Sequence, residues 1–280
     1  GSNRQIMLDL LTKLRHGPLR NLKFLWFLLR FVYRIGLGVT PSWSVSKMIG
    51  PYGPFKLDKR FAFSNFSKWG AGHNRGFISC IDRAQGIHTA FDIGAHIGLV
   101  TLPLATAVSP SGQVFAFEPG NSNRNFLQKH IRFNHIKNVV VVADLIGDKS
   151  KKSTYFYQSS SDSGMNTVAD IGRRKGYKRT KTKQITLDEF CNAHGLKPQL
   201  IKIDVEGAEL SILKGATSVI RQYMPTIFLS VHPKHIRELG GSIEELEQVI
   251  KELDYQVSDI DGKSVRPNEL TEYIVRPAHN

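Results

Sequence analysis

Four ionisable side chains interrupt or follow two apolar runs in the second half of the chain. Lys202, Asp204 and Glu206 alternate along the run that begins at Leu200, and His232 ends another apolar run. Alternation places the first three side chains on one face for as long as a strand lasts, and burying a carboxylate near a lysine without a function is costly. A carboxylate or an imidazole in such a place can take a proton from a hydroxyl group. Asp204 or His232 is therefore the candidate general base, with Glu206 and Lys202 orienting the base or the substrate.

A second group of residues has the spacing of a nucleoside site. The run Asp92-x-Gly94-x-x-x-Gly98 precedes Glu118, which ends the next apolar run. Gly94 lets the backbone approach a ligand closely, and Glu118 can accept hydrogen bonds from both ribose hydroxyls. A dinucleotide site usually has a glycine where Asp92 stands, so that backbone amides can hold a pyrophosphate. A carboxylate there repels phosphates and suits a cationic ligand such as S-adenosylmethionine; a dinucleotide, or a glycine turn without a ligand, remains an alternative.

The elements around these residues indicate a doubly wound α/β fold. Residues 89–120 read as an apolar strand, a glycine turn, an apolar helix over about 99–108 and a second strand at 113–117. That is half of a nucleotide-binding unit. In an open α/β sheet, ligands bind beyond the carboxyl ends of the strands. Asp204 and His232 both stand at such ends, although a lone histidine is also often structural.

The remaining segments supply further strands and helices. A helix over residues 121–134 leads to the all-apolar run 139–144, which predicts a strand buried on both faces. Asp144 ends that run, where it could accept a hydrogen bond from an adenine amino group or cap the next turn. Further strands are predicted at 153–158, 200–205 and 226–231, helices at 186–194 and 242–253, and two edge strands at 256–260 and 272–275. The last helix and the two edge strands are expected to be purely structural.

Residues 1–40 form a basic amphipathic segment in front of the main fold. The most apolar stretch, residues 18–39, is interrupted by Arg20, Lys23 and Arg30, so it lacks the uncharged span of a transmembrane helix. In a helix its cations share one side and its leucines and aromatics cover the rest. This pattern is typical of a helix lying in a membrane interface, and a helix packed on protein with its cations in water would show it too.

Two other segments stand apart from the α/β pattern. Residues 41–86 are rich in Gly, Pro, Ser and aromatics and predict a strand-and-loop cap, whose aromatics either anchor it to the core or, near His73, line a ligand mouth. Residues 159–183 form a polar and basic insert that is densest in cations over 173–183. Such a run is usually solvated surface, yet beside an active-site edge it could hold an anionic substrate or a membrane.

Length and composition limit the size of the core and the kinds of partner and environment that the chain can have. A chain of 280 residues can bury one α/β core plus an appendage. Its formal net charge of +14 favours an acidic partner, which could be nucleic acid, anionic lipid or a phosphorylated substrate. Cys80 and Cys191 lack metal or redox spacing and predict two structural thiols in a reducing, cytoplasmic setting. The Gly1-Ser2 start resembles a cloning scar, so native sequence is expected to precede it.

Taken in order, these motifs resemble the FkbM family of S-adenosylmethionine-dependent methyltransferases. The likeness rests on FDIGAHIG at 91–98, FEP at 117–119, TLDEF at 186–190, IKIDVEGAE at 201–209 and LKGA at 213–216. The IKIDVEGAE block is the specific part. The resemblance covers about residues 87–232 and excludes the basic insert and the N-terminal segment.

The resemblance implies a class I (Rossmann-like) methyltransferase domain over residues 87–280, with a seven-stranded, mostly parallel sheet and helices on both faces. It also implies O-methylation, often of sugar or polyketide hydroxyls. Asp92, Gly94 and Gly98, with His96 in the same turn, would surround the methionine part of the cofactor, and Glu118 its ribose. Asp204 and Glu206 would face the transfer centre. No metal is predicted, because two carboxylates without a third ligand are weak evidence for one.

The leading hypothesis is an O-methyltransferase acting on a hydroxyl of a sugar, a glycolipid or another lipid-linked substrate. It is expected to be cytoplasmic and to rest on an anionic membrane surface through residues 18–39 and 173–183. A nucleic-acid methyltransferase is the first alternative, favoured by the charge, but no nucleic-acid-binding module occurs in the sequence. A non-catalytic membrane adaptor on the same fold is the second, and the set Asp92, Glu118 and Asp204 argues against it.

Overall fold

A computed structural model describes residues 43–72, 74–159 and 177–279 of the chain. The amphipathic stretch 18–39, His73 and most of the basic insert 159–183, including its residues 173–176, lie outside the described residues. The predictions made for them therefore stay predictions.

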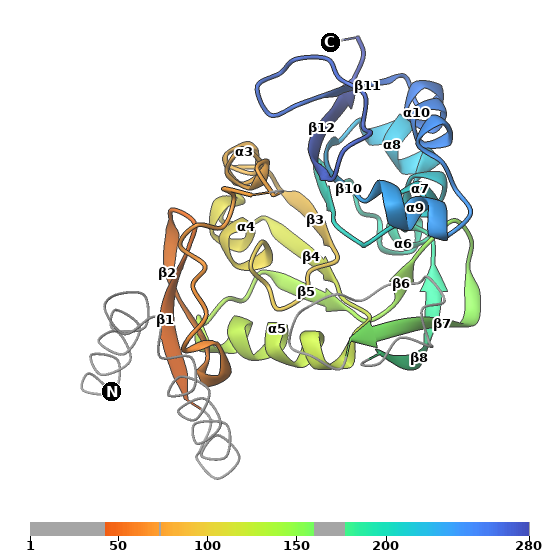
Figure 1. Cartoon of the computed structure of the whole chain (residues 1–280). Coiled ribbons are helices and arrows are strands. Elements are labelled where there is room, and N and C mark those ends of the chain that lie inside the picture. The colour runs from red at the N-terminus through yellow and green to blue at the C-terminus, as the bar shows by residue number, and fades with distance from the viewer. Residues whose placement is uncertain (1–42, 73, 160–176, 280) are drawn as a thin grey trace, which may run out of the picture.

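The described chain is built on a seven-stranded sheet with the order β11-β12-β10-β9-β3-β4-β5 (Figure 1). The strands are β3 (Thr89–Ile93), β4 (Gln113–Phe117), β5 (Val139–Val142), β9 (Leu200–Ile203), β10 (Thr226–Val231), β11 (Tyr255–Ser258) and β12 (Thr271–Pro277). The neighbours from β5 to β10 pair in parallel, and β12 pairs antiparallel with both β10 and β11. The predicted mostly parallel sheet is confirmed. Its parallel strands all end at one edge, where the predicted site residues stand.

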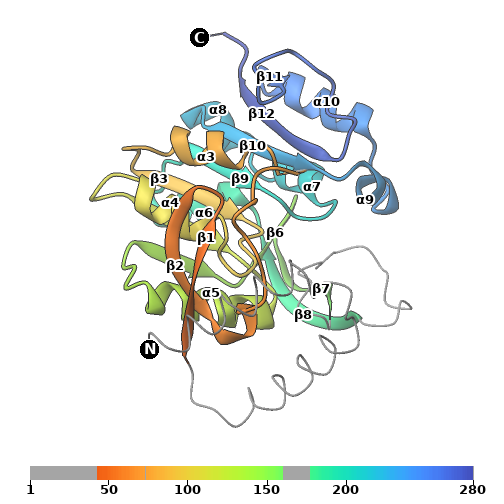
Figure 2. The same cartoon turned by 60° about the vertical axis from the view of Figure 1, so that its left-hand side comes forward.

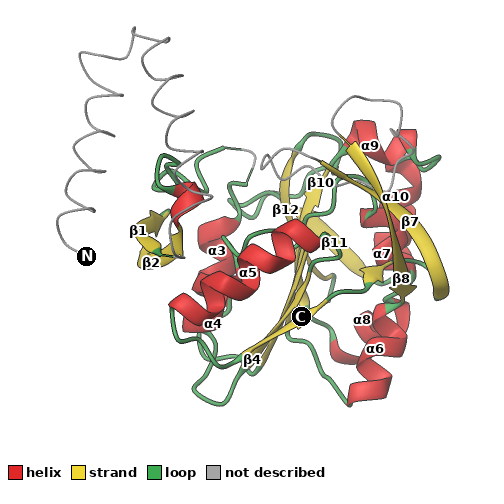
Figure 3. Ribbon diagram, turned by 90° about the horizontal axis from the view of Figure 1, so that it is seen from below, coloured by secondary structure: helices red, strands yellow, loops and turns green. Residues whose placement is uncertain are grey.

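Helices cover both faces of this sheet (Figure 3). One face carries α3 (Phe77–Arg83), α4 (Thr101–Ala107) and α5 (Asn121–Phe133), and the other carries α6 (Leu187–His194), α7 (Glu209–Lys214), α8 (Thr217–Tyr223), α9 (Pro233–Glu238) and α10 (Ile243–Glu252). Each face buries its own hydrophobic cluster against the apolar strands. Two buried clusters on opposite faces hold the sheet, and hence the edge where its strands end, in place.

Local sequence signals explain where several helices begin and end. Thr186 caps α6, its hydroxyl accepting a hydrogen bond from the Glu189 amide at 3.0 Å, and Gly195 ends the helix in the left-handed conformation with a φ of 62°. Ser242 caps α10 in the same way through the Glu245 amide, also at 3.0 Å. Capping side chains satisfy amides that the first turn leaves unpaired. The predicted helices at 186–194 and 242–253 are confirmed within one or two residues.

The cap consists of a β-hairpin that docks on α5. Strands β1 (Ser44–Ile49) and β2 (Tyr52–Asp58) pair antiparallel and lead into a short 3-10 helix, η1 (Lys59–Phe61), in front of α4 and α5 (Figure 2). The Asp58 amide donates to Nε2 of His130 at 2.9 Å, while Nδ1 of His130 lies 2.7 Å from the Ile97 carbonyl oxygen. Burial lowers the pKa of His130 to about 4, so its neutral ring links the cap to the glycine turn.

A second, three-stranded sheet with the order β6-β8-β7 stands beside the main one. It contains β6 (Leu145–Ile146), β7 (Lys151–Ser159) and β8 (Tyr177–Ile185). The prediction for residues 177–183 was surface insert, but these residues pair antiparallel with β7. The alternation of cations with threonines in β8 is a strand pattern that the charge density hid.

Two predictions about strands are wrong. β5 is not buried on both faces, because its Val140 is 40% exposed, and it is the last strand of the seven-stranded sheet as described. β12 is not an edge strand, since it pairs on both sides, and its Glu272 is buried. Within the predicted strand-and-loop cap, residues 59–63 form a 3-10 helix and a turn, and the Asp58 carboxylate caps the Arg60 amide at 3.0 Å.

Candidate active site

A buried ion network lies under the carboxyl end of β9. Lys202 is 2% exposed, and its Nζ lies 2.8 Å from Oε1 of Glu272 and 3.5 Å from Oδ2 of Asp204. The same nitrogen donates a hydrogen bond to Oγ of Ser230 at 2.8 Å. Burial alone would lower the pKa of Lys202, but the carboxylates of Asp204 and Glu272 outweigh it, so the pKa is raised. Lys202 is therefore a fixed ammonium group that orients Asp204 from below.

Asp204 connects this network to a histidine and a second buried acid. Oδ1 of Asp204 lies 3.8 Å from Nε2 of His232, and Nδ1 of His232 forms a short contact with Oε1 of Glu209. Glu209 is fully buried, whereas the Asp204 side chain is about one-third exposed. Burial lowers the pKa of His232, but the hydrogen bond and charge of Glu209 outweigh it, so the pKa is raised. Glu209 fixes one ring nitrogen and leaves Nε2 facing the solvent-accessible carboxylate.

Glu206 pairs with a histidine and does not share a strand face with Lys202. β9 ends at Ile203, so the alternation that would put Lys202 and Glu206 on one strand face stops before it reaches Glu206. Glu206 adopts a left-handed φ of 54°, and its Oε2 lies 3.2 Å from Nδ1 of His235. Burial raises the pKa of Glu206. The rings of His232 and His235 stack with their centroids 5.8 Å apart, so Glu206 joins the cluster through histidines rather than through Lys202.

The glycine turn after β3 packs directly on the loop that carries Asp204. Gly94 has a φ of 89°, and a Cβ atom there would lie 1.9 Å from the Asp204 carbonyl oxygen. Gly98 has a φ of 98°, and a Cβ there would meet the Leu127 side chain of α5 at 2.8 Å. Only glycine fits both the positive φ and the close approach. Gly94 thus brings the turn against the loop that carries Asp204, and Gly98 packs it on α5. Asp204, Glu206, Glu209, His232 and His235 are called the acid–histidine cluster below.

Three successive amides of this turn are already used within the protein. Gly94 and Ala95 both donate to the Phe117 carbonyl at 3.0 Å, and His96 donates to Oε2 of Glu118 at 2.8 Å. A pyrophosphate needs several free amides aimed at it, and these three are not free to bind one. The arrangement therefore favours a ligand without a pyrophosphate over a dinucleotide.

Electrostatics in the turn suit a cationic ligand. Asp92 is 2% exposed, and its Oδ2 accepts a hydrogen bond from the Thr101 hydroxyl at 2.6 Å. Burial raises the pKa of Asp92 to about 6, against the lowering effects of Thr101 and Lys202. Burial lowers the pKa of His96 to about 4, and its Nε2 has no hydrogen-bond partner among the described residues. At neutral pH the turn thus presents a carboxylate and a neutral imidazole.

Glu118 and Asp144 follow neighbouring strands but differ in environment. Glu118 is 4% exposed, and its carboxylate oxygens accept amide hydrogens from His96 and Gly120, both at 2.8 Å. These bonds hold the carboxylate at the end of β4, where a ribose would lie. Asp144 is partly exposed and lies 3.5 Å from Nζ of Lys183 in β8. The structure ties Asp144 to the second sheet.

The structure brings Asp92, Lys202, Asp204 and His232 together and adds residues that the sequence reasoning did not single out. Glu209 stood inside the IKIDVEGAE block, where a further acid three residues after Glu206 is a visible signal. Ser230 and Glu272 had no such signal, because they come from β10 and β12, far along the chain. Within the described ranges, no group of three or more His, Cys, Asp or Glu side chains is arranged to hold a metal ion.

Sheet order and site together define the class of protein. A parallel sheet with antiparallel β12 inserted between β10 and β11, an acidic glycine turn after β3 and an acid after β4 are the features of a class I S-adenosylmethionine-dependent methyltransferase. The residues fit that cofactor, since they combine a buried carboxylate, a turn whose first three amides are bonded within the protein, and a ribose acceptor. The model of the methyltransferase FkbM domain family matches residues 92–257. The chain belongs to the FkbM methyltransferase family.

Known relatives are distant. The AMB antimetabolite synthetase AmbE of Pseudomonas aeruginosa is 23% identical over a match that covers 67% of this chain and 10% of that protein. Methyltransferase FkbM from Methylobacillus flagellatus is 20% identical, with a TM-score of 0.46 and coverage of 68% of this chain and 43% of that one. SMU.1697c from Streptococcus mutans, solved with SAH, is 12% identical, with a TM-score of 0.43 and coverage of 72% and 93%. The chain thus spans less than half the length of the first two.

None of the helices in the described part of the chain is both long enough and apolar enough to cross a bilayer.

Proposed function

We propose that this methyltransferase acts on oxygen, transferring the methyl group to a hydroxyl of a sugar, a glycolipid or another lipid-linked substrate. The observation that carries the proposal is the Glu209–His232–Asp204 chain at the carboxyl edge of the sheet. A hydroxyl is a poor nucleophile until it loses its proton, and a positioned base contributes about 10²- to 10⁴-fold to such a step. An orienting acid, an imidazole and an accessible carboxylate are the parts that this step requires.

His232 is the proposed proton acceptor. Its Nε2 faces Asp204 while Glu209 holds Nδ1. An imidazole is also a stronger base than a carboxylate paired with an ammonium group, as Asp204 is with Lys202. Asp204 accepts a hydrogen bond from the acceptor hydroxyl and orients it, and Lys202 holds Asp204 in place. Glu206 holds His235 beside the ring of His232.

S-adenosylmethionine, when bound, would supply a methyl group activated by its sulfonium. His232 would take the proton that the acceptor hydroxyl loses when its oxygen receives that methyl group. Alignment of the two reactants can contribute roughly 7–11 kcal/mol to such a displacement. Asp92, Gly94, His96 and Gly98 are the proposed contacts of the methionine part. Glu118 would hold the ribose, and Asp144 would lie at the rim of the site, near the adenine amino group.

The test uses two separate substitutions, Asp204→Asn and His232→Ala, with His194→Ala as the matched control because His194 is exposed at the end of α6. Cofactor affinity measured by calorimetry should stay within about threefold in all three variants, since none removes a proposed cofactor contact. Turnover with a total glycan and lipid fraction should fall at least tenfold in the first two and stay normal in the control. Full activity in both site variants would refute the proposed base.

The positive charge of the second sheet favours an enzyme that works on an anionic lipid surface, on the cytoplasmic side of a membrane. Arg179, Lys181 and Lys183 alternate along β8 and are exposed, and Arg179 stacks over the ring of Tyr155 at 3.5 Å. Clustered cations near a bilayer attract its anionic headgroups. Flotation with vesicles containing phosphatidylserine should capture the protein, and Lys181→Glu should weaken capture. Tighter, steeply salt-dependent binding to RNA instead would favour a nucleic-acid methyltransferase.

A further inference from the structure

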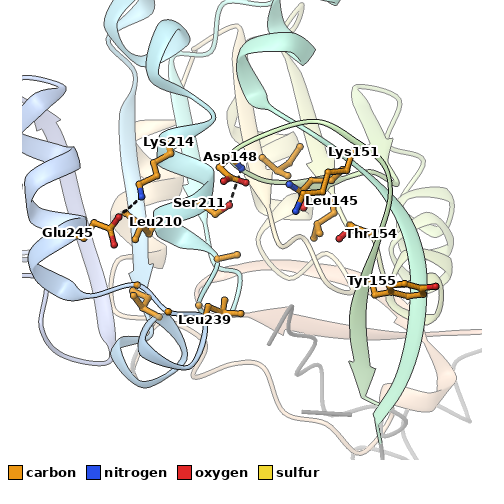
Figure 4. A pocket seen from close by; sticks show the side chains of 17 residues that line it. Leu145, Asp148, Lys151, Thr154, Tyr155, Leu210, Ser211, Lys214, Leu239 and Glu245 are labelled. Carbon is orange, nitrogen blue, oxygen red and sulfur yellow. Dashed lines mark hydrogen bonds and ion pairs between the residues drawn. The ribbon is translucent and has the colours of Figure 1, made fainter. Parts of the chain in front are cut away.

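A pocket next to the acid–histidine cluster has no role in the function described so far. It has a volume of about 380 Å³ and lies between the second sheet on one side and α7, α9 and the following loop on the other (Figure 4). Small-molecule sites typically measure about 300–1,000 Å³. The pocket is therefore large enough for a small ligand.

The pocket shares a wall with the proposed transfer centre. Gly207 lines it and directly follows Glu206, and Ile236 lines it and directly follows His235. Glu206 and His235 lie 3.2 Å apart on the cluster side of this wall. A Cβ atom on Gly207 would approach the Cβ of His235 to 2.6 Å, so the two segments are in direct contact. A group held in the pocket would thus lie beside the cluster.

The opposite wall is held in place by the main fold. The Asp148 amide donates to the hydroxyl of Ser211 in α7 at 3.0 Å. Gly215 leaves room for the Gly147 carbonyl oxygen, which a Cβ at that position would meet at 2.0 Å. Gln184 of β8 is buried, and its amide donates to the Lys149 carbonyl at 2.7 Å. The pocket is thus built largely from positioned backbone rather than from free loops.

The lining combines apolar surface with charges of both signs. Leu210 and Leu239 give apolar surface, and the polar side chains of Asp148, Lys151, Thr154, Lys214 and Glu245 lie around it (Figure 4). Lys214 and Glu245 form an ion pair with each other. Two acids and two lysines leave no net charge to attract an anion. Alternating acceptors and donors around apolar carbon instead match a neutral ring that carries several hydroxyl groups.

We infer that this pocket binds a neutral sugar residue of the acceptor. The inference rests on the proposed O-methylation of a sugar or glycolipid and narrows it to a pyranose unit held between α7 and β7. The sugar places an apolar face on Leu210 or Leu239. Its hydroxyls donate to Asp148 and Glu245 and accept from Lys151 and Thr154. The sugar then lies beside Gly207, next to the Glu206–His235 pair.

The experiment measures binding of simple sugars directly. The methyl glycosides of glucose, galactose, mannose and rhamnose are titrated into the full chain saturated with S-adenosylhomocysteine, and binding is followed by saturation-transfer NMR. Thr154→Trp fills the pocket. Ser153→Trp is the matched control, because Ser153 is the exposed neighbour on the same strand and does not line the pocket. Leu239→Trp, at a position 37% exposed, is a second filling variant that a folded chain tolerates.

At least one glycoside should bind the wild-type protein. Either filling variant should weaken that binding at least tenfold, and the control should stay within about twofold. No binding of any glycoside to wild-type protein that still binds its cofactor would overturn the inference, as would equal binding by filled and control variants. Methyl transfer to a total glycan fraction, measured on the same samples, separates the two proposals. If Thr154→Trp still transfers methyl groups with an unchanged KM, the sugar-binding role of the pocket is refuted while the proposed O-methylation stands. If the wild-type protein transfers no methyl group to any hydroxyl, the proposed O-methylation itself is refuted.

Discussion

Removing the carboxylate of Glu272 is expected to destabilise the fold, because it leaves the ammonium of Lys202 buried with less compensation. Lys202 and Glu272 are 2% and 1% exposed, with their charged atoms 2.8 Å apart. Deleting one partner of a buried ion pair costs about 3–5 kcal/mol. After Glu272→Gln, Lys202 keeps Asp204 at 3.5 Å and the Ser230 hydroxyl at 2.8 Å. The loss is therefore expected near the lower limit, about 3 kcal/mol.

Lys202→Met should cost more, about 5 kcal/mol, because it leaves Asp92 and Glu272 buried without a cation. The double variant Lys202→Met/Glu272→Gln should be more stable than the sum of the two losses predicts, by about 2 kcal/mol, since residues in one ion network do not act additively. The assay is urea unfolding followed by circular dichroism at neutral pH. In thermal unfolding, a loss of 3 kcal/mol corresponds to roughly 6–12 °C in Tm.

The control is Glu247→Gln. Glu247 pairs with Arg266 at an equally short 2.7 Å, but that pair lies at the surface. Exposed ion pairs contribute little to stability, so the unfolding midpoint should stay nearly unchanged. A loss below about 1 kcal/mol in both single variants, or strictly additive losses, would refute the view that burial makes the Lys202–Glu272 pair strong.

Three further predictions concern the site itself. Asp92→Asn should raise stability at pH 7.5 by up to about 3 kcal/mol while cofactor affinity falls at least tenfold. The native pKa of Asp92, about 6, exceeds the ordinary value, so the contribution of Asp92 to stability is greatest below about pH 4 and is lost as the pH rises through 6. The difference in stability between variant and wild type, measured by urea unfolding, should therefore grow as the pH rises through 6. Glu209→Gln removes the main influence that raises the pKa of His232. The acidic limb of the pH–kcat profile should therefore move to lower pH, and the plateau of the profile should drop. An acidic limb at the wild-type pH would contradict the Glu209–His232 pairing. Gly94→Ala should prevent folding or cofactor binding. Gly86→Ala is the control, because Gly86 has a φ of 74° with open space around it, and it should cost only about 1–2 kcal/mol in the same unfolding assay. If the two glycine variants lose the same stability, the close contact between Gly94 and Asp204 does not explain the loss in Gly94→Ala.

Much of the fold could be predicted from the sequence, because its parallel strands are short apolar runs with clear ends. β4 and β10 begin and end where the pattern placed them, and the glycine turn between β3 and α4 was visible from its spacing. β8 was missed because its cations suggested a solvated insert. β12 was misplaced because strand order depends on long-range pairing, which local alternation does not contain.

The candidate site could be predicted only in part for the same reason. Asp92 and Lys202 lie near the carboxyl ends of β3 and β9, and Asp204 and His232 directly follow β9 and β10. These strands end at one edge of the sheet, so the meeting of the four residues was foreseeable. Glu272 was not, since it reaches Lys202 only through the antiparallel insertion of β12 between β10 and β11. The partner of Glu206 was also hidden, because β9 stops at Ile203 and the left-handed turn at Glu206 sends its side chain to His235.

The most direct test of the proposed chemistry supplies the purified protein with S-adenosylmethionine labelled in its methyl group, together with separate total lipid, glycan and RNA fractions. The labelled fraction is then hydrolysed, and its methylated products are identified by mass. Label should enter the glycan or lipid fraction as a methyl ether on a sugar hydroxyl, and His232→Ala should abolish at least nine-tenths of it. Label confined to RNA, or methyl groups found only on nitrogen or carbon, would contradict the proposed transfer to a hydroxyl oxygen.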